Sequence, residues 1–384
     1  MKNLFNFFCL SIASVLCTLP LLAEVLTVGK DKTYADLTSA YKAANNGDTI
    51  EIYPGIYSGV ENTLTINKNL ILRGVGKRPV LDMSGLTIPN NKGILIASSD
   101  DITIENLEIT GAHVKSDNGS GIRVQGAKLT IRNCVFHHNE DGIQGGLPKT
   151  ELLVENCDFY ENGFGDGYTH NVYVGKIAKL TFRFNRSRRC KEGHLFKSRA
   201  QENYILYNFF ATEDATSSYE INLPQGGVAY IIGNLIQQGT LSKNDVIIAY
   251  AEEKPRNDAH ALYIINNTIV NDHKKGVFVR VREPSAECLI MNNIFVGPGK
   301  LLDGAGTLEN NLNLSASDLV NATAFNYHLT PLSSAVDGAK DPGNASGFSL
   351  IPTHEYVDPC SGKARHIVGK LDVGAFELAQ PAAK

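Results

Sequence analysis

Tryptophan is absent from the 384 residues, and methionine occurs only three times. Any stacking on a ligand ring therefore falls to the 15 tyrosines and 16 phenylalanines. Neither sign of charge dominates, since 36 Lys and Arg oppose 40 Asp and Glu and leave a formal net charge of −4. This balance argues against a polycation that coats nucleic acid, so we expect no nucleic-acid partner. A hydrophobic content of 43% also argues against a disordered chain.

Long hydrophobic runs are missing everywhere except at the start of the chain. Lys2 precedes an apolar stretch from Leu4 to Leu22, and a small residue, Ala23, stands before Glu24. This pattern predicts a secretory signal peptide cleaved near Ala23. The alternative is an uncleaved membrane anchor, since the stretch approaches the length of a membrane span. Pro20 and the polar residues that follow favour cleavage, so we expect an exported chain, periplasmic or extracellular, with no stable membrane insertion.

Cysteine is scarce and odd in number once the signal peptide is removed. Cys9 and Cys17 lie in the predicted signal, which leaves five cysteines and rules out complete internal pairing. Cys134 and Cys157 each follow an Asn and stand two residues before a Phe. Their equivalent positions predict stacked, buried thiols in place of a disulfide framework. No metal-ligand spacing of cysteines is present.

A short pattern of alternating β-branched residues around an Asn recurs through the middle of the sequence. Its copies begin at Ile102, Leu129, Leu152, Tyr204, Tyr230, Tyr263 and Leu289. The shared residues are Asn106, Asn133, Asn156, Asn208, Asn234, Asn267 and Asn293, with Asn185 in a variant copy. A spacing mostly in the twenties, with Asn at a corner, predicts a parallel β-helix with an Asn ladder. Leucine-rich repeats share the period but would need several leucines and a helix in each copy.

Each copy is followed by a second predicted strand whose polar residues fall on one outward face. The residues expected inside are Val172, Val174, Phe196, Ile221, Leu223, Val277, Val279 and Val281. Those expected outside are Arg123, Gln144, Asn171, Tyr173, Leu195, Lys197, Arg199, Glu220, Asn222, Phe278, Arg280 and Arg282. Adjacent coils lie about 4.8 Å apart, so such a row suits an extended polymer.

The ends of a β-helix expose unpaired strand edges and need covers. Residues 33–46 have helical spacing, with Thr33 or Asp36 as the N-cap and Gly47 as a stop, and they predict a capping helix. We therefore predict one domain over residues 24–384 after a signal peptide at 1–23. Within it, 24–57 form the N-terminal cap and first strand, about 58–300 the coils, and about 301–384 an irregular C-terminal cap.

Seven cations and a single acid, Glu192, lie between Arg183 and Arg199. In a chain of net charge −4, this concentration favours an anionic partner at one coil. The alternative is a solvated stretch neutralised by Glu202, Glu213 and Asp214 on neighbouring coils.

The signal peptide, the capping helix with its Gly-Asp-Thr-Ile entry at 47–50 and the Asn-bearing coils resemble the pectate-lyase-like right-handed parallel β-helix superfamily. The resemblance implies an all-β, single-stranded right-handed parallel β-helix. The superfamily contains lyases, hydrolases, epimerases and non-catalytic adhesins. Lys197-Ser198 with the Asn-rich strand that follows also resembles the chondroitinase B and alginate lyase family, which implies that Lys197 acts as a base. That family's downstream Arg has no counterpart in residues 220–227.

The residues themselves indicate how such chemistry would proceed. Removing a proton next to a uronate carboxylate requires a base and a cation that stabilises the developing charge. We expect Lys197 as the base, Arg199 as the carboxylate clamp, Glu220 as a helper and His170 as a proton shuttle, with His194 on the adjacent coil. The substrate-binding candidates are Asn171, Tyr173, Asn222, Arg280 and Arg282.

Each candidate also has a structural interpretation. Lys197 and Glu220 could form only a cross-strand ion pair, His194 could point inward, and Arg280 and Arg282 could be ordinary surface charges. No carboxylate pair of the kind a hydrolase needs is evident. The sequence therefore predicts an exported protein that acts on an acidic polysaccharide, as a β-eliminating lyase, with a C5-epimerase or a non-catalytic binding protein as alternatives. It leaves calcium use and oligomeric state open.

Overall fold

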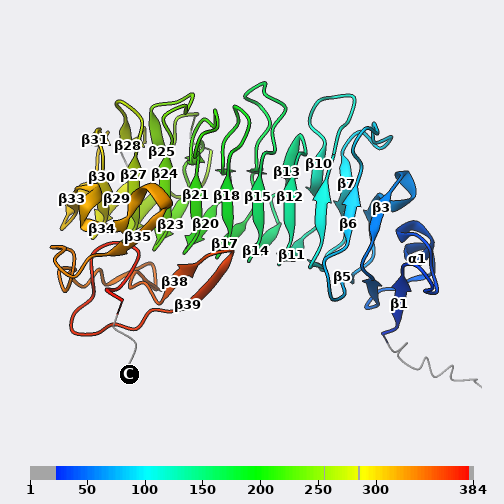
Figure 1. Ribbon diagram of the computed structural model, residues 1–384. Coiled ribbons are helices and arrows are strands. Elements are labelled where there is room, and N and C mark those ends of the chain that lie inside the picture. Colours follow the sequence, from blue (N-terminus) through cyan, green and yellow to red (C-terminus); the bar gives the residue numbers. More distant parts are fainter. Residues whose placement is uncertain (1–22, 255, 284–285, 380–384) are drawn as a thin grey trace, which may run out of the picture.

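The computed structural model describes residues 23–254, 256–283 and 286–379, and the predicted signal peptide lies almost entirely outside them. Three long parallel sheets wind around a common axis, and each complete coil contributes one strand to each sheet (Figure 1). The right-handed parallel β-helix is therefore confirmed. We refer to the 12-, 11- and 10-stranded sheets as sheets A, B and C. Among the described residues no helix combines the length and the apolar character needed to cross a bilayer.

Sheet A consists of β1 Val25–Val28, β2 Thr49–Ile52, β5 Leu70–Gly74, β8 Ile102–Glu105, β11 Lys128–Arg132, β14 Glu151–Glu155, β17 Lys179–Arg183, β20 Glu202–Leu206, β23 Val228–Ile232, β26 Ala261–Ile265, β29 Glu287–Met291 and β32 Thr307–Glu309. Sheet B consists of β3 Ile56–Ser58, β6 Val80–Asp82, β9 Glu108–Thr110, β12 Val135–His137, β15 Asp158–Tyr160, β18 Arg186–Arg188, β21 Phe209–Ala211, β24 Leu235–Gln238, β27 Thr268–Asn271, β30 Ile294–Val296 and β33 Leu312–Leu314. Sheet C consists of β4 Leu64–Ile66, β7 Gly93–Ala97, β10 Ser120–Val124, β13 Asp141–Gly145, β16 Val172–Val174, β19 Lys197–Ser198, β22 Ile221–Leu223, β25 Val246–Tyr250, β28 Val277–Val281 and β31 Lys300–Asp303.

The interior is filled by one hydrophobic residue above another, because parallel in-register strands place equivalent side chains on adjacent coils. Phe136 stacks on Phe159 with ring centroids 4.8 Å apart, and Phe182 follows at 5.9 Å from Phe159. The predicted inward set of sheet C agrees with the structure. Seven of its eight residues are buried, and Val277, at the start of β28, is half-buried.

The turn between sheets A and B corrects the predicted Asn alignment by one residue. Asn133 and Asn156 occupy the left-handed position of the turn, with φ of 54° and 57°. In later coils the repeated Asn is the next residue, and it forms the ladder, as where Asn208 Oδ1 accepts the Asn185 backbone N–H at 2.9 Å. Asn suits both positions, since it tolerates positive φ and its amide bonds to backbone, so the sequence alone does not separate them.

The ladder continues through the predicted stacked thiols. Cys134 and Cys157 are free and buried, and they stand one residue after the left-handed Asn. The Cys157 backbone N–H donates to Asn185 Oδ1 at 2.9 Å, and the Cys134 N–H donates to Cys157 Sγ at 3.4 Å. The sulfur therefore takes the place of the amide oxygen in the earlier coils.

At the N-terminal end the capping helix is shorter than expected. Helix α1 runs over Leu37–Ala43, and Asp36 is its N-cap, with Oδ1 accepting the Ser39 N–H at 2.8 Å. Its buried residues Leu37 and Ala40 lie against the first coils. Strand β1 precedes the helix and pairs in parallel with β2, so sheet A starts earlier than the sequence indicated.

After β33 the chain turns back along the outside of the coils in place of extending the stack (Figure 1). It contains the 3-10 helices η2 Ala316–Asp318 and η3 Ala322–Ala324 and three hairpins, β34 Leu319–Asn321 with β35 Asn326–Leu329, β36 Asn344–Ala345 with β37 Phe348–Ser349, and β38 His354–Val357 with β39 Ser361–Ala364. A further 3-10 helix, η1 Val60–Asn62, lies near α1. The C-terminal segment buries Tyr356 and Phe376 against Phe209 and Leu235 of sheet B. The described residues that it packs against belong to sheets A and B or to the turns between them, so it leaves the outer face of sheet C uncovered.

Candidate functional site

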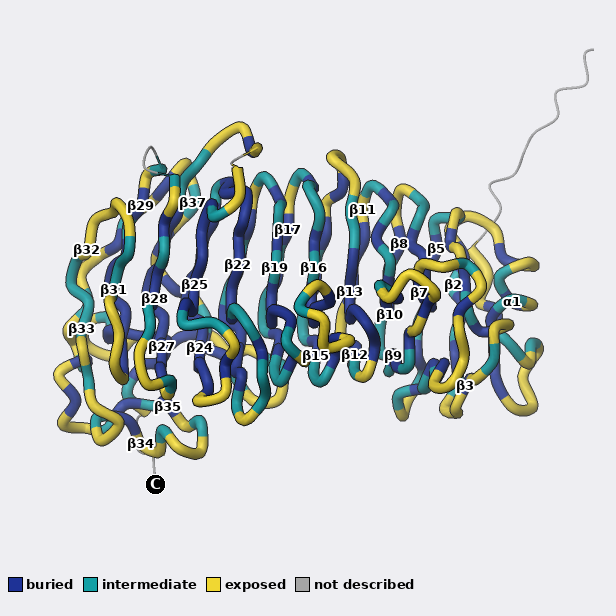
Figure 2. The backbone as a smooth tube through the Cα atoms, turned by 90° about the horizontal axis from the view of Figure 1, so that it is seen from above, coloured by how far each residue is buried: buried dark blue, intermediate teal, exposed yellow. Residues whose placement is uncertain are grey.

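A single row of side chains runs along the outer face of sheet C, one from each strand. Strand pairing aligns, in order, Thr65, Ile96, Arg123, Gln144, Tyr173, Lys197, Asn222, Ala249, Arg280 and Asp303. We call these residues the sheet C row. Figure 2 shows its central strands side by side as a largely buried band between more exposed loops.

Lys197, the predicted base, lies near the centre of the row, and its side chain is half-buried. Its Nζ is 5.2 Å from the centroid of the Tyr173 ring, and the Arg199 guanidinium is 5.1 Å from the same ring. Arg199 Nη1 donates to the Tyr173 hydroxyl, while Arg199 Nη2 pairs with Glu253 at 2.6 Å. The Tyr173 ring therefore lies close to two cations, of which Arg199 is held by a carboxylate.

The pKa of Lys197 lies below the usual value for lysine. Burial is the main cause, because it disfavours the charged ammonium, and the positive charge of Arg199 adds to the effect. Glu253 and Asp141 oppose this lowering of the pKa. A lysine with a lowered pKa carries a larger fraction of free amine near neutral pH, which is what a proton-abstracting base requires.

Two histidines stack beside Lys197 and remain neutral. The rings of His170 and His194 are 4.5 Å apart, and His170 Nδ1 accepts the His194 backbone N–H at 3.0 Å. Burial lowers the pKa of both, to about 3 for His194, and the charges of Lys197 and Arg199 lower it further. The His170 ring meets Tyr173 edge-on at 5.5 Å. With only 1% of its surface exposed, His170 can position Tyr173 but has little access to a ligand.

Buried polar atoms without hydrogen-bond partners gather at this face. Twelve such side-chain atoms occur in the described residues, and six belong to the sheet C row or to residues beside it. These six are Arg123 Nε, Asp141 Oδ2, Gln144 Oε1, His170 Nε2, His194 Nδ1 and Asn222 Oδ1. Buried polar groups are normally satisfied, so the unpartnered atoms of the row itself, on Arg123, Gln144 and Asn222, indicate a surface whose partners come from a ligand or solvent.

Comparisons with known proteins agree with this architecture. Residues 26–189 match the model of the Pel9A-like right-handed β-helix region. The crystal structure of pectate lyase Pel9A superposes with a TM-score of 0.57 over 93% of this chain and 96% of its own, at 18% identity. The chain has the pectate-lyase-like β-helix fold. The expected superfamily resemblance is thereby confirmed, whereas the local likeness to chondroitinase B and alginate lyases stays a prediction.

Sequence relatives of this pectate-lyase-like β-helix match only part of their own length. SHC SH2 domain-binding protein 1 from Mus musculus is 30% identical over 179 residues, which are 46% of this chain and 24% of the mouse protein. Pectate lyase L from Dickeya chrysanthemi is 28% identical over 138 residues, 33% of this chain and 32% of the lyase. The chain thus matches about a quarter to a third of these curated relatives.

Two of the predicted site residues of the pectate-lyase-like β-helix are buried in its corners. The Glu220 carboxylate accepts from Thr212 Oγ1 at 2.7 Å and from Gln238 Nε2 at 3.3 Å, and none of its surface is exposed. Asn171 is also fully buried and donates to Ser187 Oγ at 3.1 Å. Both residues precede their strands, where strict alternation does not hold, so the expected outward orientation was wrong for them. It was also wrong for Leu195 and Phe278, which are buried in the hydrophobic core.

Burial shifts the pKa of the two carboxyl groups near this face strongly. It raises the pKa of Glu220 and of Asp141 to about 8 each, so both are protonated at neutral pH. Asp141 Oδ1 accepts the His170 backbone N–H at 2.8 Å. Asp141, the first residue of β13, was not among the residues that the sequence predicted for the site.

Arg280 and Arg282 lie on the outer face as expected, but both form ion pairs with carboxylates of the chain itself. Arg280 pairs with Asp303 at 3.0 Å and with Glu252 at 3.4 Å, and Arg282 pairs with Asp303 at 2.7 Å. Tyr219, which the sequence did not single out, meets the His194 ring edge-on at 4.9 Å. Its spacing from His194 repeats the coil period, and that signal could have found it.

The basic stretch 183–199 is not one patch, because a single coil distributes its residues over three faces. Arg183 ends β17 in sheet A, Arg186 lies on β18 in sheet B, and Lys197 lies on β19 in sheet C. The five arginines pair with carboxylates of other segments, at 2.6–3.6 Å for the shortest contact of each. The ion pairs made by the cations of this stretch involve its arginines, and Lys191 and Lys197 make none with any described residue. Neutralisation by neighbouring coils thus accounts for the arginines, but not for these two lysines.

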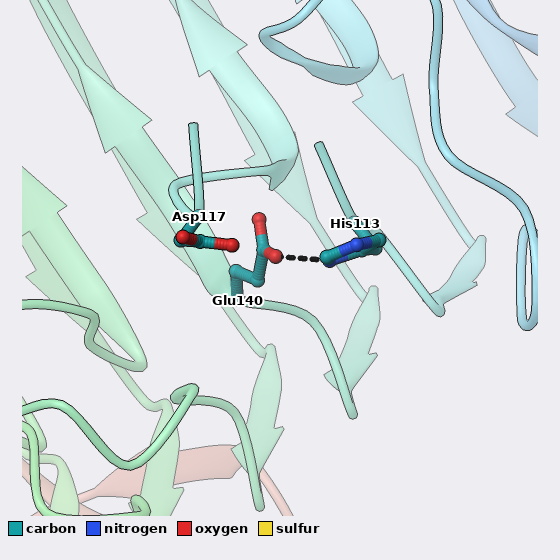
Figure 3. Close-up of side chains that lie close together, drawn as sticks. All are labelled: His113, Asp117 and Glu140. Atoms are coloured by element: carbon teal, nitrogen blue, oxygen red, sulfur yellow. Dashed lines mark hydrogen bonds and ion pairs between the residues drawn. The ribbon is translucent and has the colours of Figure 1, made fainter. Parts of the chain in front are cut away.

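One group of three side chains has the composition of a metal site. His113, Asp117 and Glu140 place ligand atoms within 4.8 Å of one another, and Glu140 contacts His113 Nδ1 directly (Figure 3). The other oxygen of Glu140 accepts backbone N–H groups from Val114 and Gly119. Because its carboxylate is already used to hold this loop, the geometry fits a loop anchor better than a cation site.

Proposed function

We propose that this protein is exported and cleaves a uronate-containing polysaccharide by β-elimination at the sheet C row. The observation that carries the proposal is Lys197, a lysine of lowered pKa that makes no ion pair with the described residues and lies among unpartnered polar atoms. The pectate lyases among the structural and sequence relatives support the substrate class.

In this mechanism the free amine of Lys197 removes the proton at C5 of a uronate, next to its carboxylate. The electron pair forms the C4–C5 double bond as the C4–O bond breaks, and the leaving oxygen takes a proton from solvent. Arg199 lies beside Lys197 and stabilises the charge that develops on the substrate carboxylate, which competes with Glu253 for the guanidinium.

The other predicted residues have supporting functions in this proposal. Tyr173 and Asn222 flank Lys197 in the row, and Gln144 extends the surface by one coil. Tyr173 contacts the sugar rings, whereas the buried Asn222 offers only its unpartnered Oδ1. His170 is a positioning residue that packs against Tyr173. Arg280 and Arg282 can contact a carboxylate only by displacing Asp303, and Glu220 and Asn171 hold the corners of the coils.

The test is an ultraviolet assay for unsaturated uronate on residues 24–384. It is run on polygalacturonate, alginate and glycosaminoglycans, with and without calcium. Wild type should produce absorbance on one of these polymers, and Lys197→Ala should lose at least 100-fold in rate, as expected for removal of a general base. Lys179→Ala is the matched control, because Lys179 belongs to the same coil but lies on sheet A.

The outcomes separate the three candidate functions. Absorbance that is independent of Lys197 would refute the assigned base. Absence of absorbance, with exchange of the C5 proton for deuterium, would indicate an epimerase. Binding without either reaction would indicate a polysaccharide-binding protein.

A further inference from the structure

The loop between β15 and β16 exposes two aromatic rings. Tyr168 has 81% of its surface exposed and Phe164 has 55%. Along the chain, Phe164 and Tyr168 lie nine and five residues before Tyr173, which belongs to the sheet C row. Exposed aromatic side chains that gather near a candidate site commonly mark a contact surface for a ligand.

A closed hydrogen-bond network holds this loop in place. Asp166 Oδ1 accepts the backbone N–H of Tyr168 at 2.8 Å and the hydroxyl of Thr169 at 2.9 Å. The Thr169 hydroxyl oxygen in turn accepts the Phe164 N–H at 2.7 Å. The rings are therefore presented by an ordered turn, which lowers the entropy lost when they bind a ligand.

A cavity of about 340 Å³, partly lined by Phe164, opens at the turns between sheets B and C. Its lining crosses several coils and includes Gly85, Gly111, His138, Glu140, Gly163 and Lys191. A Cβ at Gly111 would lie 2.3 Å from the Ser84 backbone nitrogen, and one at Gly163 would lie 2.7 Å from the Lys191 carbonyl oxygen. Glycine therefore allows adjacent turns to approach closely at these two positions.

The unpaired charge of the cavity is positive. Glu140 is occupied by His113 and by backbone amides, as Figure 3 shows for the histidine. His138 is paired with Glu161 at 3.2 Å. Lys191 is exposed and forms no ion pair within the described chain. An anionic ligand would thus find one free ammonium group beside an aromatic ring.

We propose that Phe164, Tyr168 and Lys191 form an accessory subsite for the acidic polysaccharide, next to the reacting unit on sheet C. The inference rests on the proposed function. The two rings pack against the apolar C–H faces of pyranose units, and Lys191 contacts a uronate carboxylate. Because this loop leads directly into β16, which carries Tyr173 of the row, a chain held at the subsite continues onto the sheet C row.

The test compares the binding of polymer and of trisaccharide by calorimetry, using the substrate polymer found in the lyase assay. The Phe164→Ala/Tyr168→Ala double variant should bind the polymer about tenfold more weakly, the effect expected for the loss of two aromatic contacts. Lys191→Ala should weaken polymer binding about threefold at low salt and less at high salt. The affinity for a trisaccharide, which occupies the row alone, should stay unchanged.

The controls are chosen to isolate each contact. Tyr168→Phe keeps the ring and should bind like wild type, and Lys77→Ala removes an exposed lysine far from the loop. Polymer affinity of the double variant within twofold of wild type would overturn the subsite while leaving the proposed function intact. If wild type binds no acidic polymer, both the proposed function and the subsite are refuted.

Discussion

Replacing Glu220 by Gln should make the protein more stable at alkaline pH. Glu220 is fully buried, and burial raises the pKa of its carboxyl group from 4.5 to about 8. The folded state therefore retains a proton that the unfolded chain releases above pH 4.5. As the pH rises from about 4.5 to about 8, the wild type loses stability, because unfolding becomes coupled to proton release.

The size of the effect follows from the two pKa values. A difference of about 3.5, at about 1.4 kcal/mol for each pKa unit, corresponds to about 5 kcal/mol. The glutamine side chain does not titrate and can keep the contacts with Thr212 and Gln238. Glu220→Gln should thus match wild type near pH 4.5, exceed its stability by about 3 kcal/mol at pH 7 and by about 5 kcal/mol above pH 8.

Melting curves followed by circular dichroism from pH 4.5 to 9 measure this difference. With about 2 °C for each kcal/mol in a chain of this size, the gap between the two melting temperatures should widen to about 10 °C. Glu151→Gln is the matched control, because Glu151 is exposed on sheet A. Parallel melting-temperature curves for Glu220→Gln and wild type would show that Glu220 is ionised in the folded protein and would refute the reasoning.

Two further predictions concern the ladder and the base. Asn208→Ala removes the acceptor of the Asn185 N–H and the donor to the Phe182 carbonyl, both buried, so it should cost about 4 kcal/mol of unfolding free energy. A loss below about 1 kcal/mol in chemical denaturation would contradict the role of the ladder. Arg199→Gln removes a positive neighbour of Lys197, so the pKa of Lys197 should rise and the rate profile should move to higher pH. An unmoved profile would exclude Lys197 as the titrating base.

The fold could be predicted from the sequence because the repeat that spaces the strands also places equivalent hydrophobic side chains above one another in the interior. Val172 and Phe196 lie inside as the alternation requires. The corner was harder, since Asn133 and Asn208 look alike in sequence but occupy adjacent positions with different functions. Only the pairing of strands decides between the left-handed residue and the ladder residue.

The candidate site was predictable where a residue lies within a strand and unpredictable where it precedes one. Tyr173 and Lys197 lie on their strands and share the outer row. Glu220 and Asn171 immediately precede a strand, and local hydrogen bonds turn their side chains into the corner. The prediction of one basic patch over residues 183–199 was wrong for another reason. Residues that are close in sequence lie on different sheets of the same coil.

The returning C-terminal segment changes how the molecule should fold. A solenoid with contacts only between neighbouring coils can unravel coil by coil. Here Asn156 Nδ2 donates to the Cys360 carbonyl across 204 residues, and Arg186 pairs with Asp358 across 172 residues. These bonds join the middle coils to a much later part of the chain, which raises the contact order and slows folding. In return, the coils beneath the segment are locked together and should unfold as one cooperative unit, whereas the coils before them remain free to fray.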